Sequence, residues 1–471
     1  MILRRRCFKM DLFENISPID YRYYGRDKEV KDALLPYLSE NAYIRYKLKV
    51  EAALADALVN EGICSKEIAL DISKACDKVT ATEVYKEEDR IKHDIRALAN
   101  CIRAKVSKKA RRFVHFSLTS YDVVDTANVL RYKEFCEKVL LPALVELEKT
   151  WIEIALREKD TLQVGRTHGQ HAEPITFGFT MASYVNRLGG RIEAIISAED
   201  GLRGKISGAV GAYNASSLFF KNPIAFEKNL LETLGLEPAL HSTQIAAPEP
   251  MTDLMHSVVS AFAVLANFSD DMRNLQRTEI AEVKEEFSAE QVGSSTMPHK
   301  RNPINFENVK SMYKAFMPTM MCAYLDEISE HQRDLTNSAS QRFIPQLFAA
   351  FYVSVVRLTK VSRRLAVDKE NLSMNFDMSK EMVAAEPLYM LLSLHGHPDA
   401  HEYVRKLTLK AEKEETGLRN VMEIDDELEP YLNKFSDAEK EIIFNPDLYT
   451  GMASVKTDMV CEFWKNRLQI K

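Results

Sequence analysis

The stretch Leu140-Leu-Pro-Ala-Leu-Val-Glu-Leu-Glu-Lys-Thr-Trp-Ile-Glu-Ile154 carries the pattern that decides the fold. Its apolar side chains recur in alternating steps of four and three residues, at Leu140, Leu144, Leu147, Trp151 and Ile154. Charged side chains lie between them, at Glu146, Glu148, Lys149 and Glu153. This spacing is typical of one face of an α-helix, and it predicts a long amphipathic helix within residues 122–160.

Other segments are equally free of helix breakers. The 471 residues include only 16 glycines and 16 prolines, and these gather in a few places. We therefore expect further long helices over residues 175–203, 252–286 and 305–367, with kinks at Pro318 and Pro345 in the last. Several helices of this length predict an all-α protein with a central bundle.

The chain is longer than one hydrophobic core usually serves, so we expect three helical domains. The first is an N-terminal helical domain over residues 1–118. The second, over residues 119–367, is the central bundle of long helices and includes the glycine-bearing loop of residues 291–303. The third is a C-terminal helical domain over residues 368–471.

Composition narrows the class of protein. The 63 Lys and Arg residues against 69 Asp and Glu residues argue against general nucleic-acid binding. The seven cysteines occur singly, without the spacing of zinc sites or disulfide frameworks, which indicates a reducing compartment. No uninterrupted apolar run approaches the roughly 18 residues of a membrane span. We expect a cytoplasmic protein with no nucleic-acid or membrane partner.

The most informative loop is Gln291-Val-Gly-Ser-Ser-Thr-Met-Pro-His-Lys-Arg-Asn-Pro303. Its backbone N–H groups could surround a carboxylate, and Lys300 could neutralise the charge. Ser294 or Ser295 could then reach a carbon-bound proton. A flexible surface loop is the alternative for any serine- and glycine-containing stretch, but the order Met-Pro-x-Lys-x-Asn argues against it.

This loop resembles the signature of the fumarase/aspartase superfamily. The resemblance implies that Ser294 is the general base, that Lys300 and Asn302 hold the substrate carboxylate, and that Ser295 and Met297 contact the substrate. A serine hydroxyl is a weak base, so it must lose its proton in a desolvated, cationic setting.

A second segment, Gly165-Arg-Thr-His-Gly-Gln-His-Ala-Glu-Pro174, resembles the Thr-His-Gly element of the same superfamily. The resemblance implies that His168 protonates the leaving nitrogen and that Glu307, seven residues after Lys300, orients it. Taken alone, a histidine is more often structural, and Glu307 could be a solvated residue at the start of a helix.

Two upstream segments, Lys92-His-Asp-Ile95 and Val114-His-Phe-Ser-Leu-Thr-Ser-Tyr-Asp122, resemble the other signature elements. The resemblance implies that the site is lined by His93, Asp94, His115, Thr119 and Ser120. The last two precede a long helix, whose N-terminus would favour a bound carboxylate. Simple N-capping is the alternative role for both.

Further residues suit a phosphate group. The stretch Ser17-Pro-Ile-Asp-Tyr-Arg-Tyr23, and the stretch Gln332-Arg-Asp-Leu-Thr-Asn-Ser338 followed by Arg342, resemble phosphate-binding elements of the adenylosuccinate lyases, one family of this superfamily. The resemblance implicates Arg22, Tyr23, Arg333, Ser338 and Arg342, and it places Gln244 near the scissile bond. A single arginine is usually surface charge, but two arginines nine residues apart with a serine between them suit a phosphate.

The resemblance extends from Ser17 to about Val367. It implies elimination of fumarate from a succinylated purine nucleotide, no metal or redox cofactor, and a homotetramer whose active sites combine several subunits. Argininosuccinate lyase or carboxymuconate cycloisomerase activity, and a tetramer that has lost catalysis, are the alternatives. The phosphate-binding residues argue against the first two, and intact Ser294, His168, Lys300 and Glu307 argue against the third.

Overall fold

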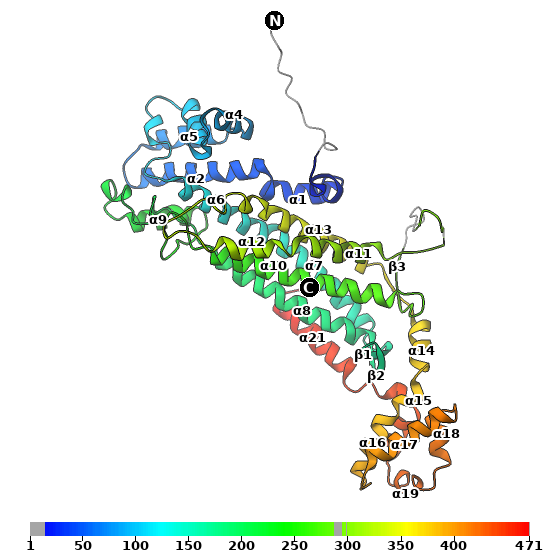
Figure 1. Ribbon diagram of the computed structural model, residues 1–471. Coiled ribbons are helices and arrows are strands. Elements are labelled where there is room, and N and C mark those ends of the chain that lie inside the picture. Colours follow the sequence, from blue (N-terminus) through cyan, green and yellow to red (C-terminus); the bar gives the residue numbers. More distant parts are fainter. Residues whose placement is uncertain (1–14, 287–293, 298, 471) are drawn as a thin grey trace. The chain divides into compact units, whose positions relative to one another are not determined.

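The computed structural model describes residues 15–286, 294–297 and 299–470. Helices account for 66% of the structure, which confirms the predicted all-α class. The chain forms two compact units, and helices make up most of the ribbon (Figure 1). The first takes its described residues from Met1–Leu144, Arg191–Ala263 and Ser311–Val356, and the second from Val145–Gly190, Val264–Lys310 and Arg357–Lys471.

Most elements of the first unit are short to medium helices. They are η2 Ile19–Tyr23, α1 Lys28–Leu38, α2 Glu40–Asn60, α3 Lys66–Cys76, α4 Ala81–Ile91, α5 Asp94–Lys105, η3 Arg111–Phe113, α6 Ser120–Phe135, η4 Cys136–Leu140, η5 Ser216–Leu218, α9 Pro223–Thr233, α12 Thr319–Asp326 and η6 Ser340–Phe343. Helix α2 packs against both α3 and α6. Its buried residues Leu54, Ala57 and Leu58 recur at helical spacing, which is why it forms the centre of this group.

The predicted long helix within residues 122–160 is confirmed. Helix α6 continues through the π turn η4 into α7, Leu141–Arg157. The π turn ends two residues before Pro142, whose missing N–H cannot donate to the preceding turn. The five predicted apolar side chains are all at most 2% exposed.

The expected position of one charged side chain on this helix is wrong. Glu148 is buried instead of lying on a polar face. Its neighbours Thr150, Ile152 and Ala155 are buried as well, so α7 is covered on almost every side. Burial raises the pKa of the Glu148 carboxyl well above its ordinary value. Neither carboxyl oxygen has a hydrogen-bond partner among the described residues.

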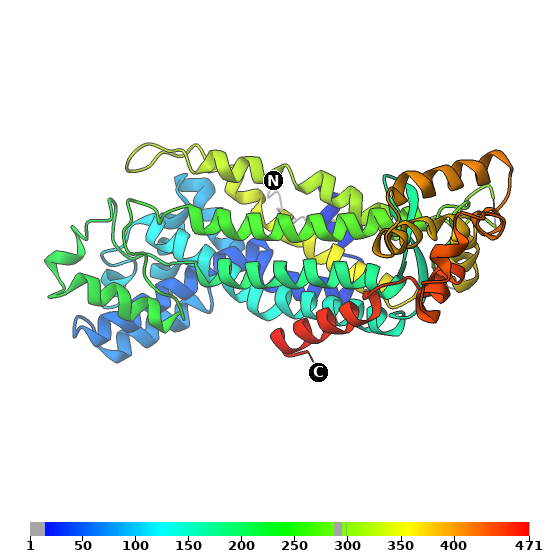
Figure 2. The same cartoon turned by 90° about the horizontal axis from the view of Figure 1, so that it is seen from below.

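Four further long helices are α8 Phe177–Asp200, α10 Glu249–Leu275, α11 Ile304–Phe316 and α13 Ile344–Ser362. In the second unit, the Trp151 ring lies 4.4 Å from that of Phe268, which lies 5.1 Å from that of Tyr184. The Trp151 indole donates to the hydroxyl of Ser362 over 3.1 Å. The C-terminal helix α21, Ala453–Arg467, lies beside α8 (Figure 2), and its Trp464 donates to Asn186.

Two predicted helix ends are wrong. The helix expected to reach residue 286 stops at Leu275 (α10), and the one expected to reach residue 367 stops at Ser362 (α13). Beyond these ends, β3 Val283–Glu285 pairs with β4 Leu365–Val367. Buried Glu282 accepts hydrogen bonds from Gln163, Arg166 and Asn375, so tertiary contacts override helix propensity there.

The predicted helix over residues 305–367 is divided into α11, α12 and α13. Pro318 is the N-cap of α12 instead of a kink. Pro345 is the second residue of α13, a position where its missing N–H removes no helical hydrogen bond.

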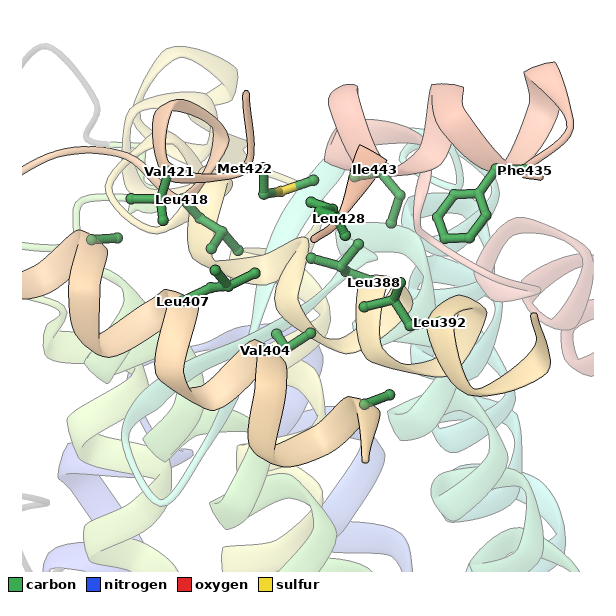
Figure 3. Close-up of a cluster of buried hydrophobic side chains, with 12 residues drawn as sticks. Leu388, Leu392, Val404, Leu407, Leu418, Val421, Met422, Leu428, Phe435 and Ile443 are labelled. Atoms are coloured by element: carbon green, nitrogen blue, oxygen red, sulfur yellow. The ribbon is translucent and has the colours of Figure 1, made fainter. Parts of the chain in front are cut away.

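The C-terminal part of the second unit has its own apolar cluster (Figure 3). Its buried side chains include Leu388, Leu392, Leu407, Val421 and Leu428. The helices there are α14 Lys369–Asp377, α15 Lys380–Val383, α16 Ala385–Leu394, α17 Ala400–Lys413, α18 Leu418–Glu423, α19 Glu429–Leu432, α20 Asp437–Phe444 and η7 Pro446–Leu448.

Two helical segments, Glu249–Leu275 and Ser340–Ser362, are long and apolar enough by composition to cross a membrane, each with a mean hydropathy of 1.2. However, 67% and 61% of these windows are buried within the protein. Core helices of folded domains pass the same test, so these segments are weak indicators of a membrane protein.

Candidate active site

A cavity of about 410 Å³ lies in the first unit. Its wall combines the junction of α4 and α5, the start of α6, a loop before α10 and the segment before α13. Seven residues predicted to bind substrate line it: His93, Asp94, Thr119, Ser120, Gln244, Ser338 and Arg342. The fold thus brings together side chains from four distant parts of the sequence.

The start of α6 presents two of these side chains. Thr119 is its N-cap, and the Asp122 carboxylate accepts a hydrogen bond from the Thr119 backbone N–H over 2.8 Å. Thr119 and Ser120 also line the cavity, so capping and substrate binding are compatible here. Hydroxyl groups at a helix N-terminus suit an anionic ligand.

A buried ion pair fixes this helix end to the glycine-bearing segment that follows α8. Lys205 and Asp122 pair with neither side chain exposed, and Asp122 also accepts from the Gly208 backbone N–H over 3.1 Å. Thr126 donates to the Lys205 carbonyl over 2.9 Å. Removing one partner of such a buried pair typically costs about 3–5 kcal/mol, so the pair is a strong link between the two segments.

The loop that carries Gln244 is held from two sides. The Asp125 carboxylate accepts from the Ala246 backbone N–H over 3.0 Å, and the Gln244 backbone N–H donates to the Gln332 carbonyl over 3.4 Å. Burial raises the pKa of Asp125 to about 6. These contacts keep the Gln244 side chain in the cavity wall.

His93 and Asp94 combine structural and cavity-lining roles. The Nδ1 atom of His93, the N-cap of α5, accepts from the Arg96 backbone N–H over 3.3 Å. Asp94 lies 3.3 Å from the buried Nζ of Lys47. Both side chains also line the cavity.

Four predicted residues, Arg22, Tyr23, His115 and Arg333, are not among those lining this cavity. Arg22 and Tyr23 belong to η2, where Arg22 is exposed. Arg333 donates to the hydroxyl of the cavity-lining Tyr121, with its guanidinium 4.2 Å from the ring centre.

His115 instead pairs with a buried carboxylate, with its Nδ1 atom 2.6 Å from an oxygen of Glu51. Burial alone would lower the pKa of His115, but the charge and hydrogen bond of Glu51 outweigh it and leave the pKa raised. His115 has a φ of 59°, a left-handed conformation that fixes its direction.

In the second unit, His168 lies at the tip of a hairpin between β1 Leu162–Thr167 and β2 Gln170–Thr176. His168 and Gly169 have φ values of 53° and 75°, which suit a tight two-residue turn. A non-glycine residue in this conformation is often found at functional sites. The imidazole is exposed.

The predicted signature loop also belongs to the second unit, and its residues Gln291, Val292, Gly293 and Pro298 lie outside the described residues. The half-buried Ser294 accepts from the backbone N–H groups of Thr296 and Met297 over 3.3 and 3.1 Å. Ser295, Met297 and Lys300 are exposed.

Asn302 lies just before α11, and exposed Glu307 lies in the first turn of that helix. Within the described part of the chain, no hydrogen bond joins Glu307 to His168. Their pairing stays a prediction.

The chain is similar to two lyase family models and to adenylosuccinate lyases of other organisms. Residues 25–317 match the family model described as Lyase, and residues 329–437 match the model described as Adenylosuccinate lyase C-terminal. The adenylosuccinate lyase of Pyrococcus abyssi is 36% identical over 93% of this chain and 95% of that protein. That of Methanocaldococcus jannaschii is 34% identical over 96% of each chain.

The chain belongs to the adenylosuccinate lyase family. The match to adenylosuccinate lyases continues to residue 437, so the expectation that the resemblance ends near Val367 is wrong. A solved 3-carboxy-cis,cis-muconate lactonizing enzyme from Pseudomonas putida covers 93% of this chain and 98% of its own, with a TM-score of 0.81. At 22% sequence identity, that likeness shows a shared fold alone.

For this member of the adenylosuccinate lyase family, sequence reasoning missed several cavity-lining residues. They include Tyr43, Lys92, Asn128, Arg131 and Gln341. A signal was present for two of them, because Asn128 and Arg131 follow Ser120 by eight and eleven residues and so share its helix face.

Proposed function

We propose that the protein eliminates fumarate from adenylosuccinate to give AMP, and from the succinylated carboxamide ribotide of purine synthesis to give its carboxamide product. The cavity of the first unit carries this proposal. It offers donors for two anionic groups, with Thr119 and Ser120 at the N-terminus of α6 and Ser338 and Arg342 on the segment before α13. A succinylated nucleotide has carboxylates and a phosphate to occupy them.

In the proposed reaction, Ser294 removes a proton from the carbon β to the nitrogen. Lys300 and Asn302 hold the carboxylate that gains negative character. The C–N bond then breaks, its electron pair stays on nitrogen, and His168 supplies the proton, with Glu307 orienting the imidazole. A double bond forms in the fumarate, so the chain's own groups supply both proton transfers and no metal or redox cofactor takes part.

The base and acid lie in the second unit, and the cavity lies in the first. We propose that the enzyme is a homotetramer whose active sites combine segments of different subunits, which accounts for the dispersal of the signature elements along the chain. We also propose a cytoplasmic location. None of the six cysteines that the structure describes forms a disulfide, which supports a reducing compartment.

A fumarate-release assay tests this function. The wild-type protein should release fumarate from adenylosuccinate and not from argininosuccinate or malate, and Ser294→Ala should abolish most of the release. Release from argininosuccinate or malate in preference to adenylosuccinate would overturn the proposal.

A further inference from the structure

Arg131 is a buried arginine in the wall of the cavity. It lies on α6 and is 4% exposed. Its guanidinium is 5.0 Å from the ring centre of Tyr43 and 4.6 Å from that of Tyr132, and it donates to the Tyr132 hydroxyl over 2.7 Å. The aromatic contacts hold the side chain in place without neutralising it.

Arg131 lacks a counter-charge within the described part of the chain. No carboxylate there lies within 4.0 Å of its guanidinium, and its Nε has no acceptor. A buried cation without a partner is strongly unfavourable. By contrast, the buried Lys205 and Lys47 each pair with an aspartate.

The carboxylates that line the same cavity do not pair with Arg131. Glu40 accepts from the Tyr85 hydroxyl, and Asp94 pairs with Lys47. Glu88 also lines the wall, at the end of α4 near Lys92. The counter-ion of Arg131 is therefore best supplied by an anionic ligand.

The helix places Arg131 far from the N-terminal donors. Ser120, Val124, Asn128 and Arg131 all line the cavity, so one face of α6 forms a continuous stretch of its wall. Eleven residues at a rise of about 1.5 Å separate Ser120 from Arg131 by about 16 Å. Arg342 lies at the Tyr43 end, because both residues line this cavity and an adjoining one that also contains Lys47. The carboxylates of Glu40, Glu88 and Asp94 line both cavities as well.

We propose that Arg131 binds the phosphate group of the nucleotide, at the end of the cavity remote from Thr119 and Ser120, and so helps to determine specificity for phosphorylated substrates. This inference rests on the proposed function, in which Thr119 and Ser120 at the N-terminal end of α6 bind a carboxylate of the substrate. The guanidinium has unused N–H groups with which to bind phosphate oxygens.

The test compares Arg131→Met and Arg131→Lys with wild type. Binding of AMP and of adenosine is measured by calorimetry, and KM is measured for adenylosuccinate and its dephosphorylated form, succinyladenosine. Arg131→Met should weaken AMP binding roughly tenfold to a hundredfold and leave adenosine binding unchanged. Arg131→Lys keeps a point charge but not the planar fork, and it should weaken AMP binding several-fold.

Arg103→Met is the matched control. Arg103 is also partly buried in the first unit, but its guanidinium donates to the carbonyls of Arg111 and Val114 and does not line the cavity. The Arg103→Met variant should change the affinities for AMP and adenosine by the same factor or leave both unchanged. Circular dichroism and melting temperature establish whether each variant is folded. If Arg131→Met does not fold, the AMP and adenosine binding of Arg131→Lys decides whether Arg131 binds the phosphate.

The two proposals fail differently. If wild type releases no fumarate from adenylosuccinate, the proposed function is wrong, and the AMP and adenosine comparison still decides the role of Arg131. If wild type releases fumarate but the Arg131 variants weaken AMP and adenosine equally, or bind AMP like wild type, the phosphate assignment is overturned.

Discussion

Adjacent serines in the signature loop have different surroundings. Ser294 is half-buried and its hydroxyl accepts two backbone N–H bonds, whereas Ser295 is exposed. We expect Ser294→Ala to lower kcat at least about a hundredfold, because it removes the general base, and to leave KM close to wild type. Ser295→Ala is the control and should have a smaller effect on kcat. Equal losses in steady-state assays, or a larger loss at Ser295, would show that the first serine is not the base.

The pair of His115 and Glu51 makes stability depend on pH. The pKa of folded His115 is raised above its ordinary 6.5, so the stabilisation from its protonated form is complete below pH 6.5 and is lost as pH rises through the folded pKa. Glu51→Gln should therefore cost about 3 kcal/mol of unfolding free energy at pH 6 and less at pH 9.

Urea unfolding at both pH values measures this difference. Asparagine tolerates a left-handed φ, so His115→Asn is the control and should remove the pH dependence of the Glu51→Gln effect. A cost of Glu51→Gln that grows with pH would contradict the assigned shift.

Site residues could be predicted from the sequence where a recognisable motif also carries side chains suited to binding the ligand. The resemblance of residues 114–122 to a signature element placed Thr119 and Ser120 in the site, their position before a long helical pattern suits an anionic ligand, and the cavity contains both. Arg131 was missed because an arginine within an amphipathic pattern looks like surface charge, and only the packing of Tyr43 and Tyr132 around it reveals a buried cation.

At the level of helices, α8 and α21 meet at a glycine. A Cβ atom on Gly189 would overlap the ring of Trp464, whereas one on Gly190 would meet no heavy atom within 4 Å. We expect Gly189→Ala to lower the unfolding free energy by about 1–3 kcal/mol, because the indole must shift.

Gly190→Ala is the control on the same helix and should raise that free energy by up to about 1 kcal/mol, because alanine favours the helical backbone. Chemical unfolding of both variants measures the contrast. Similar values for the two would mean that Trp464 does not pack closely on α8.

Helix extents were predictable where periodicity alone determines them. The run through α6, η4 and α7 matches the predicted helix closely, since its five apolar positions are all buried. The end of α10 was not predictable, because no glycine or proline marks it. It depends on Glu282, which is withdrawn from the helix by partners more than 90 residues away in the sequence.

At the level of the assembly, mixing inactive variants tests whether sites are shared. His168→Ala and Ser294→Ala should each be nearly inactive, because one lacks the acid and the other the base. If different subunits supply the two residues to one site, exchange of subunits should restore part of the activity, since hybrid tetramers contain intact sites. Fumarate release after verified exchange measures this, and activity no higher than that of the parents would contradict shared sites.

The wide sequence range of the cavity wall has a consequence for synthesis on the ribosome. Its first and last wall residues, Leu38 and Pro345, are 307 positions apart. At about 5–20 residues per second, the last wall segment emerges about 15–60 s after the first. Until then the wall of the cavity is incomplete, so the growing chain passes through a long interval in which its partly covered apolar surface is open to premature association.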